Sequence, residues 1–280
     1  MNLFQAHSKT AKFDYFTSSI RFMDKDWRDF LAPVIHQTWP DITPKEATPN
    51  KPFLKGVEVL NDNQNRLLLI SYGGDHVKGI TQVHSTGDNA PDLHRALKLS
   101  GLDHEPTRID SAIDWDEEYL FDTLAPVFKQ FAVEKGLKIG MLGDWHRNEA
   151  RTLSIGSRNA PLFVRLYEKG YEQRAKGDEK ASLSWVRFEV EIKYKKSKQR
   201  RRMAQLSPSD MFSLGWIGDL CKTIMFEVSS MPMPSSYSSP DIDRSLAHVK
   251  KQYRKVFERL ADQCESPEEF MNILLSRNVA

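Results

Sequence analysis

The sequence predicts an α+β protein in which helices pack on one side of a largely antiparallel sheet. Two observations support this prediction. Short β-branched and aromatic runs recur between positions 13 and 194, separated by segments with helical periodicity. After position 203 the pattern becomes helical. We therefore expect one domain over residues 1–230 and a C-terminal helical appendage over residues 241–280.

The expected strands are short apolar or alternating runs bounded by turn residues. They cover residues 13–22, a hairpin at 56–74 with its turn at 61–65, 80–88, 106–118, two strands around a turn at 156–161, and 183–194. The expected helices have apolar residues at three- and four-residue spacing. They cover 24–39 with Asp24 as N-cap, 90–102, 118–137 ending at Gly136, 207–226, and a pair from about 242 onward. No internal repeat is evident in the sequence.

Composition and charge indicate a globular intracellular protein. Of the 280 residues, 40% are hydrophobic, which is enough to fill a sizeable core, and the formal net charge is only +2. The two cysteines do not suggest a disulfide framework. There is neither a signal peptide nor a run near the ~18 apolar residues of a membrane span. We expect a cytoplasmic protein that does not engage a membrane.

Carboxylates share one face of the expected strand that contains "RIDSAID". Asp110 and Asp114 point the same way, with Ile109 and Ile113 toward the core. Paired carboxylates are costly without a cation between them, and hard oxygen ligands suit Mg²⁺ or Mn²⁺. A solvated acidic face would give the same pattern, so that alternative stays open.

The segment "WVRFEVEIKY" has the clearest strand alternation in the chain. Arg187, Glu189, Glu191 and Lys193 lie on one face, and apolar residues lie on the other. Any half-exposed strand would alternate in this way. Two separate strands with same-face acids are more informative than either strand alone.

The segment "RLYEKGYEQR" places two tyrosines among cations. Tyr167 and Tyr171 share a face whether the segment is strand or helix, and we expect the strand to end near Gly170. Arg165 and Lys169 are predicted to lie on the face of Tyr167. Nearby cations favour loss of the phenol proton, and a phenolate can attack phosphorus. Tyrosine beside arginine and lysine is also common at strand ends.

The basic run at residues 193–202 has seven positive charges in ten residues and no acid. It is a candidate patch for nucleic-acid phosphates, and a solvated loop is the alternative. With Arg187, the candidate DNA-binding residues are Lys193, Lys195, Lys196, Lys198, Arg200, Arg201 and Arg202.

In order, "GITQVHSTGD", "TRIDSAIDWDE", "RTLSIGSRNAPLFVRLYEKGYE" and "WVRFEVEIKYKKSKQRRRMAQL" resemble the Rep-trans replication initiation factor family. Members of that family initiate rolling-circle replication of small plasmids and filamentous phages. The resemblance covers roughly residues 55–225, and "SLAHVKKQYRKVFERL" is similar to the family's C-terminal helix. The succession of "SIGSR", "VRLYEKG" and "VRFEVEIK" is its most specific part.

This resemblance implies a metal-dependent DNA endonuclease that nicks and rejoins the origin strand through a 5′-phosphotyrosine. It gives the role of nucleophile to Tyr167 and that of phosphate-holding neighbours to Arg165 and Lys169. It matches Asp110 and Glu189 to the family's metal-site acids. Asp114 and Glu191 are neighbouring candidates for the Mg²⁺ or Mn²⁺ site.

The implied partners are double-stranded origin DNA and its nicked single strand. A host helicase and a polymerase are further candidate partners, and a homodimer is the alternative to a monomer. Two other functions stay open. The chain could be a non-catalytic DNA-binding regulator of phage or plasmid replication, or an RNA-binding module with stacking aromatics such as Trp185.

Overall fold

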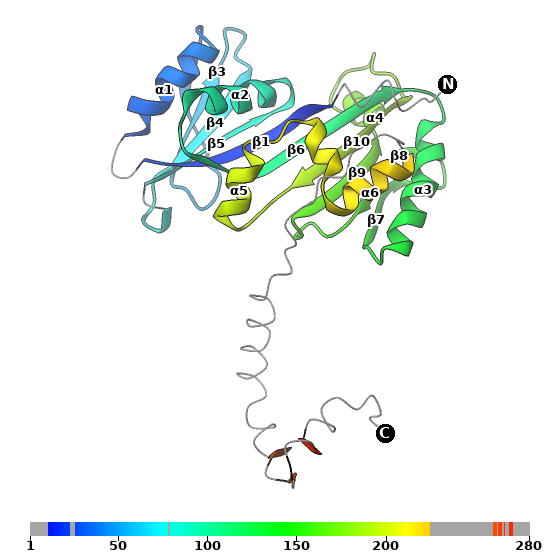
Figure 1. The fold of residues 1–280 in the computed structure, drawn as a ribbon. Helices are drawn as coiled ribbons and strands as arrows, with labels where there is room; N and C mark the ends of the chain where they lie inside the picture. The colour runs from blue at the N-terminus through cyan, green and yellow to red at the C-terminus, as the bar shows by residue number, and fades with distance from the viewer. Residues whose placement is uncertain are drawn as a thin grey trace. The chain divides into compact units, whose positions relative to one another are not determined.

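The computed structural model describes residues 11–22, 26–77, 79–224 and a few positions between 260 and 270. The chain divides into two compact units, Met1–Pro232 and Met233–Ala280, and the fold described below is that of the first (Figure 1). Nearly all of the helices expected from 242 onward lie outside the described residues. The predicted domain limits therefore stay a prediction. No helix among the described residues is long and apolar enough to span a membrane.

One antiparallel sheet of ten strands runs through this unit, in the spatial order β2-β3-β4-β5-β1-β6-β10-β9-β8-β7. The strands are β1 Lys12–Arg21, β2 Thr43–Ala47, β3 Lys55–Leu60, β4 Arg66–Tyr72, β5 Ile80–Thr86, β6 His104–Asp116, β7 Ile139–Asp144, β8 Glu149–Ile155, β9 Leu162–Glu168 and β10 Trp185–Ile192. The sheet confirms the predicted α+β class.

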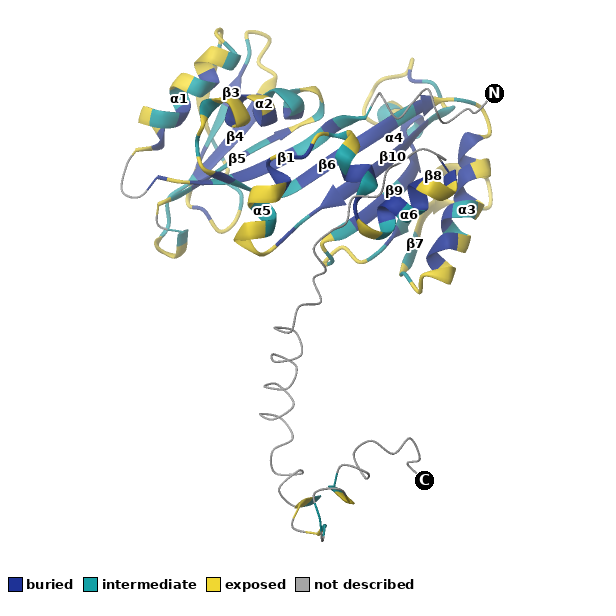
Figure 2. Cartoon of the chain, in the orientation of Figure 1, coloured by how far each residue is buried: buried dark blue, intermediate teal, exposed yellow. Residues whose placement is uncertain are grey.

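Helices cover one face of the sheet (Figure 1). They are α1 Trp27–Thr38, α2 Ala90–Ser100, α3 Leu120–Glu134, α5 Ser197–Met203 and α6 Gly215–Ile224. Between helices and sheet lies an apolar core, in which Phe128 and Phe212 pack edge to face on Phe188 at centroid distances of 5.1 and 5.0 Å. Buried residues are concentrated in the central strands (Figure 2). The other face of the sheet carries polar side chains, and the short helix α4, Lys169–Ala175, borders it.

The sheet consists of two halves with the same topology. In the first half β1 lies at the centre of the sheet, α1 follows, and β2 to β5 return as a meander from the edge to pair with β1. In the second half β6 lies at the centre, α3 follows, and β7 to β10 return in the same way to pair with β6. The two central strands pair antiparallel with each other, as an approximate two-fold axis between them requires. This structural repeat is not evident in the sequence.

Most elements predicted from the sequence are confirmed. The expected hairpin forms β3 and β4, and the backbone N–H of Asn61 donates to the carbonyl of Asn65 across its turn at 3.0 Å. Gly136 follows α3 with φ +61°, a left-handed conformation that glycine adopts without strain. The N-cap of α1 is Asp26, whose Oδ1 accepts from the backbone N–H of Arg28 at 2.9 Å. The predicted cap, Asp24, lies outside the described residues.

Four elements were not predicted. β2 and β7 are the two edge strands, and β2 lies in a proline-rich segment in which no strand was expected. Proline is tolerated on an edge because one side of the strand needs no ladder hydrogen bond. α4 begins directly after β9, and α5 forms within the basic run. Both helices have seven residues and little apolar periodicity.

Candidate active site

The polar face of the sheet is built by alternation along β10. Val186, Phe188 and Val190 are buried in the core, so the intervening side chains point to the opposite face. On that face Arg187 is in register with Tyr167 of β9 and with Asp114 of β6. Cross-strand partners have Cβ atoms roughly 5 Å apart. The predicted tyrosine, glutamates and aspartates therefore lie on one face, as the sequence indicated.

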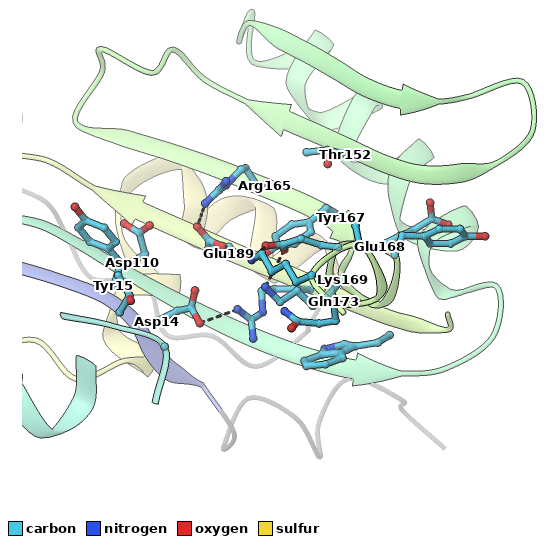
Figure 3. A pocket seen from close by; sticks show the side chains of 18 of the residues that line it. Asp14, Tyr15, Asp110, Thr152, Arg165, Tyr167, Glu168, Lys169, Gln173 and Glu189 are labelled. Carbon is cyan, nitrogen blue, oxygen red and sulfur yellow. Dashed lines mark hydrogen bonds and ion pairs between the residues drawn. The ribbon is translucent and has the colours of Figure 1, made fainter. Parts of the chain in front are cut away.

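Tyr167 lies within this polar network and is only 8% exposed. Its hydroxyl donates to Oε2 of Glu189 at 3.1 Å (Figure 3). Burial raises the pKa of Tyr167, the charge of Glu189 raises it further, and Arg187 works against both. We expected nearby cations to favour the phenolate, and that expectation is wrong for this arrangement. The phenol is protonated and hydrogen-bonded to a carboxylate.

The two predicted phosphate-holding cations are close to Tyr167 but differently placed. Arg165 precedes it on β9, pairs closely with Glu189, and has its guanidinium carbon 5.7 Å from the tyrosine ring centroid. Lys169 is the first residue of α4 and does not continue the strand. Its Nζ lies 5.6 Å from the ring centroid and donates to Oε2 of Glu172 at 2.8 Å.

Three predicted metal-site acids meet beside Tyr167. Asp110 is in register with Glu191, and Glu189 lies two residues along the same strand. All three are almost fully buried. Arg108 holds two of them, with Nη2 lying 2.5 Å from Oδ2 of Asp110 and 3.0 Å from Oε2 of Glu191. Burial raises the pKa of Asp110, the two glutamates raise it further, and Arg108 works against this.

The donor chemistry of these acids fits a divalent cation. Three hard carboxylates buried together repel one another unless a cation offsets their charge. Both carboxylate oxygens of Glu191 also lack a hydrogen bond of acceptable geometry, although Arg108 and Lys193 pair with them. Among the described residues, no cluster of three or more histidine, cysteine, aspartate or glutamate side chains has metal-binding geometry. In this structure Arg108 pairs with Asp110 and Glu191, and Arg165 pairs with Glu189.

Asp114, the fourth predicted ligand, has different partners. Its Oδ1 accepts from Nε of Arg187 at 2.7 Å and from the indole N–H of Trp185 at 2.8 Å. Its side chain is 24% exposed, and its contacts orient the arginine opposite Tyr167. Its predicted role in metal binding stays a prediction.

Most of these groups line a cleft of about 750 Å³ between the polar face and α4, but Asp114 and Glu191 are not among its lining residues. Among the lining residues that sequence reasoning missed are Arg108 of β6 and Lys12, Asp14 and Tyr15 of β1. Oδ1 of Asp14 accepts from Nη1 of Arg187 at 2.7 Å. The guanidinium of Arg108 stacks on Tyr15, with its central carbon 4.1 Å from the ring centroid. The available signal was the alternation in "KFDYF", but β1 lies far from the other site residues in sequence.

Glu168 and Tyr171 are displaced from the nucleophile. The carboxylate of Glu168 pairs with Arg151 of β8 at 2.8 Å, and that arginine also binds Asp122 of α3. Tyr171 is on α4, past the end of the strand, at the outer part of the cleft.

The basic run does not line the cleft. Residues 197–203 form α5 on the helix-covered face, where Arg201 pairs with Asp103 at 3.1 Å and Arg200 donates to the carbonyl of Tyr194 at 2.7 Å. Lys193 is closer to the site and pairs with Glu191. Lys195, Lys196, Lys198 and Arg202 are exposed. Their predicted contacts with DNA stay a prediction.

Fold and site together define an α+β protein in which a tyrosine, the buried carboxylates of Asp110 and Glu189 and several cations line one cleft. The fold is similar to a structure described as the rolling circle replication initiator protein from Geobacillus stearothermophilus. The TM-score is 0.52 at 16% identity, over 81% of this chain and 89% of that one. Residues 105–274 match the family described as replication initiation factor, and the chain belongs to that family. No curated protein matches the chain.

Proposed function

We propose that this protein initiates rolling-circle replication by nicking one strand of its origin DNA, with Tyr167 as the nucleophile. The proposal rests chiefly on one observation. In a member of the replication initiation factor family, the hydroxyl of a buried tyrosine is hydrogen-bonded to Glu189 at 3.1 Å, among carboxylates and cations that line an open cleft. Nucleophile, proton acceptor and anion-binding groups are therefore within reach of one phosphodiester.

The chemical step is a transesterification. Oη of Tyr167 attacks the phosphorus and loses its proton to Glu189, which already accepts the hydrogen bond. The bond from phosphorus to the 3′ oxygen breaks, and that oxygen leaves as a 3′-hydroxyl after gaining a proton. The 5′ end stays on the enzyme as a phosphotyrosine diester. One phosphodiester replaces another, so the reverse step can close the strand without ATP.

The cations of the site hold the phosphate. Arg165 and Lys169 lie 5.7 and 5.6 Å from the centroid of the tyrosine ring, and their charges offset the negative charge that builds on the non-bridging oxygens. A divalent ion held by Asp110, Glu189 and Glu191 would add Lewis-acid polarisation of the phosphate. For that ion to bind, Arg108 and Arg165 must release the carboxylates with which they pair.

The proposed partners are duplex origin DNA and, after nicking, its displaced single strand. The 3′-hydroxyl would serve a host polymerase, and a helicase would open the duplex ahead of it. Whether the protein acts as a monomer or a homodimer is part of the same proposal.

The proposal is tested by incubating the full chain with supercoiled DNA of its own replicon and Mg²⁺ or Mn²⁺. We expect nicked circles and a protein–DNA adduct that survives denaturation and disappears when EDTA is present from the start. Binding of the DNA without nicks or adduct would contradict the proposal. It would favour the non-catalytic DNA-binding regulator that the sequence left open.

A further inference from the structure

We propose that Trp185 and Gln173 form a nucleobase subsite at the outer part of the cleft, which takes an unpaired adenine of the DNA strand held beside Tyr167. This inference rests on the proposed function for the identity of the strand. The two side chains come from β10 and α4, which are in contact, and both line the cleft. Neither has a role in the chemistry proposed above.

The indole of Trp185 is held in place but keeps part of its surface open. Its N–H donates to Oδ1 of Asp114 at 2.8 Å, and the same oxygen accepts from Nε of Arg187 at 2.7 Å. The ring is only half-buried. The guanidinium carbon of Arg187 lies 5.9 Å from the ring centroid. Because the N–H is already used, the exposed part of the ring beside Arg187 is what a ligand can contact. A ring fixed in this way loses little conformational entropy when a base stacks on it.

The subsite lies next to Tyr167 on the same face of the sheet. Trp185 is two residues from Arg187 on the same face, and Arg187 is in register with Tyr167. Diagonal neighbours of this kind have Cα atoms roughly 7–8 Å apart. A base attached to the nucleotide next to the attacked phosphate can therefore reach the indole.

Gln173 supplies the polar half of the subsite. Lys169, Glu172, Gln173 and Lys176 follow helical spacing and line the cleft together. The three charged members pair with one another. Within the part of the chain that the structure describes, the amide of Gln173 has no hydrogen-bond partner. Figure 3 shows Gln173 beside Lys169, on the same side of the sheet as Tyr167.

The position of α4 relative to β10 is fixed by close packing. A Cβ at Gly170 would come within 1.8 Å of the carbonyl oxygen of Ser182, so only glycine fits at this contact. Arg174 donates from Nε to the carbonyl of Ala181 at 2.8 Å. The segment that leads into Trp185 therefore packs directly on α4. The subsite is pre-formed, which lowers the entropic cost of binding.

The chemistry of the two side chains selects the ligand. An aromatic face and a free amide match a flat base with donors and acceptors on its edge. A glutamine amide has one donor and one acceptor side by side, which pair with N7 and N6 of adenine. The cleft opens beside a residue proposed to attack DNA, so we assign the base to single-stranded DNA.

The test is binding of fluorescein-labelled 12-mers, (dA)12, (dT)12, (rA)12 and an abasic 12-mer, at one fixed salt concentration. For the wild type we expect (dA)12 to bind most tightly. Stacking on one aromatic ring contributes about 1–3 kcal/mol, so Trp185→Ala should weaken (dA)12 binding by roughly 5- to 150-fold. Trp185→Phe keeps an aromatic face, so it should weaken (dA)12 binding much less than Trp185→Ala does. Gln173→Ala should bring the affinities for (dA)12 and (dT)12 close together.

A second readout does not depend on affinity. We expect 2-aminopurine within a (dA)12 strand to be quenched by the wild type and by Trp185→Phe, but not by Trp185→Ala. Equal (dA)12 affinity and equal quenching for wild type and Trp185→Ala would overturn the subsite, as would tighter binding of (rA)12. Nicking is not needed for either measurement. Quenching without nicking would therefore contradict the proposed function but support the subsite. Nicking without quenching would support the proposed function but contradict the subsite.

Discussion

Nη1 of Arg187 lies 2.7 Å from Oδ1 of Asp14, and this contact joins the two halves of the sheet at the candidate active site. Arg187 is 3% exposed and is held by Asp14 on one side and Asp114 on the other. It is in register with Tyr167 and lowers the pKa of that phenol. Asp14, in the half of the sheet that lacks Tyr167, thus positions the guanidinium of Arg187 in the half that contains Tyr167.

Asp14→Asn should slow nicking by about tenfold, because a charge-assisted hydrogen bond to a buried guanidinium contributes about 1.5–3 kcal/mol. Arg187 would be held less firmly, so the pKa of Tyr167 should rise. The pH dependence of nicking should then move to higher pH. The measurement is the single-turnover rate against pH. Asp219→Asn is the matched control, since it breaks an exposed ion pair with Lys135. A lower rate with an unmoved pH profile would count against positioning through Arg187.

The contributions of the acidic residues to metal binding can be distinguished, because these residues pair with different side chains. Asp110→Asn and Glu189→Gln should each lower Mn²⁺ affinity at least tenfold and abolish nicking, while duplex binding stays close to that of the wild type. Asp114→Asn should lower the affinity for Mn²⁺ less than those two variants do, because Asp114 accepts hydrogen bonds from Arg187 and Trp185. Calorimetric titration with Mn²⁺ compares the three variants. Full nicking by Asp110→Asn and Glu189→Gln in EDTA would rule out the metal site.

The basic run offers a test of phosphate binding without loss of fold. Replacing Lys195, Lys196 and Lys198 with alanine should weaken binding to all duplex DNA. The slope of log affinity against log salt should flatten by about 0.9 for each phosphate that the variant no longer neutralises. Arg200→Ala should instead reduce stability, because its Nε donates to the carbonyl of Tyr194 at 2.7 Å. An unchanged slope in the triple lysine variant would mean that these residues are only a solvated surface.

Much of the site face was predictable because β10 alternates so regularly. A period of two places Glu189 and Glu191 on one face wherever the strand lies. The contribution of β1 was not predictable, because the pairing of Tyr15 with Asp110 is long-range information that no local pattern carries. The pKa of Tyr167 was misjudged for a related reason. The sequence shows the cations beside the phenol, but it shows neither the burial nor the glutamate across the strand.

The short helices were missed for a different reason. α4 has seven residues and includes Gly170, so intrinsic propensity gives little signal. Packing of that glycine on the carbonyl of Ser182 fixes the helix in place. Four of the seven residues of α5 are basic, and Met203 is its one apolar residue, which packs into the core. The charge of this segment indicated only that it is exposed. The packing of Met203 into the core, which the sequence does not show, favours the helix.

Stability should depend on pH through His94. This histidine of α2 packs against Phe13 and Phe16, and burial lowers its pKa to about 4, with a backbone hydrogen bond to Ala204 working against this. An unfolded chain binds the proton from about pH 6.5 downward, so the contribution of neutral His94 is full above pH 6.5 and is lost toward pH 4. His94→Gln should narrow the difference in Tm between pH 7.5 and pH 5. An equal difference in both proteins would show that other groups control acid unfolding.

The most direct test of the account is to identify the residue that carries DNA after nicking. The adduct is digested with protease and nuclease, and mass spectrometry locates the modified peptide. We expect the nucleotide on Tyr167, with no adduct from Tyr167→Phe and a normal adduct from the matched control Tyr171→Phe. Removing the hydroxyl of Tyr167 leaves the ring in place, so the cost in stability should be about 1 kcal/mol and the variant should fold. A nucleotide on Tyr171, or full nicking by Tyr167→Phe, would contradict the account.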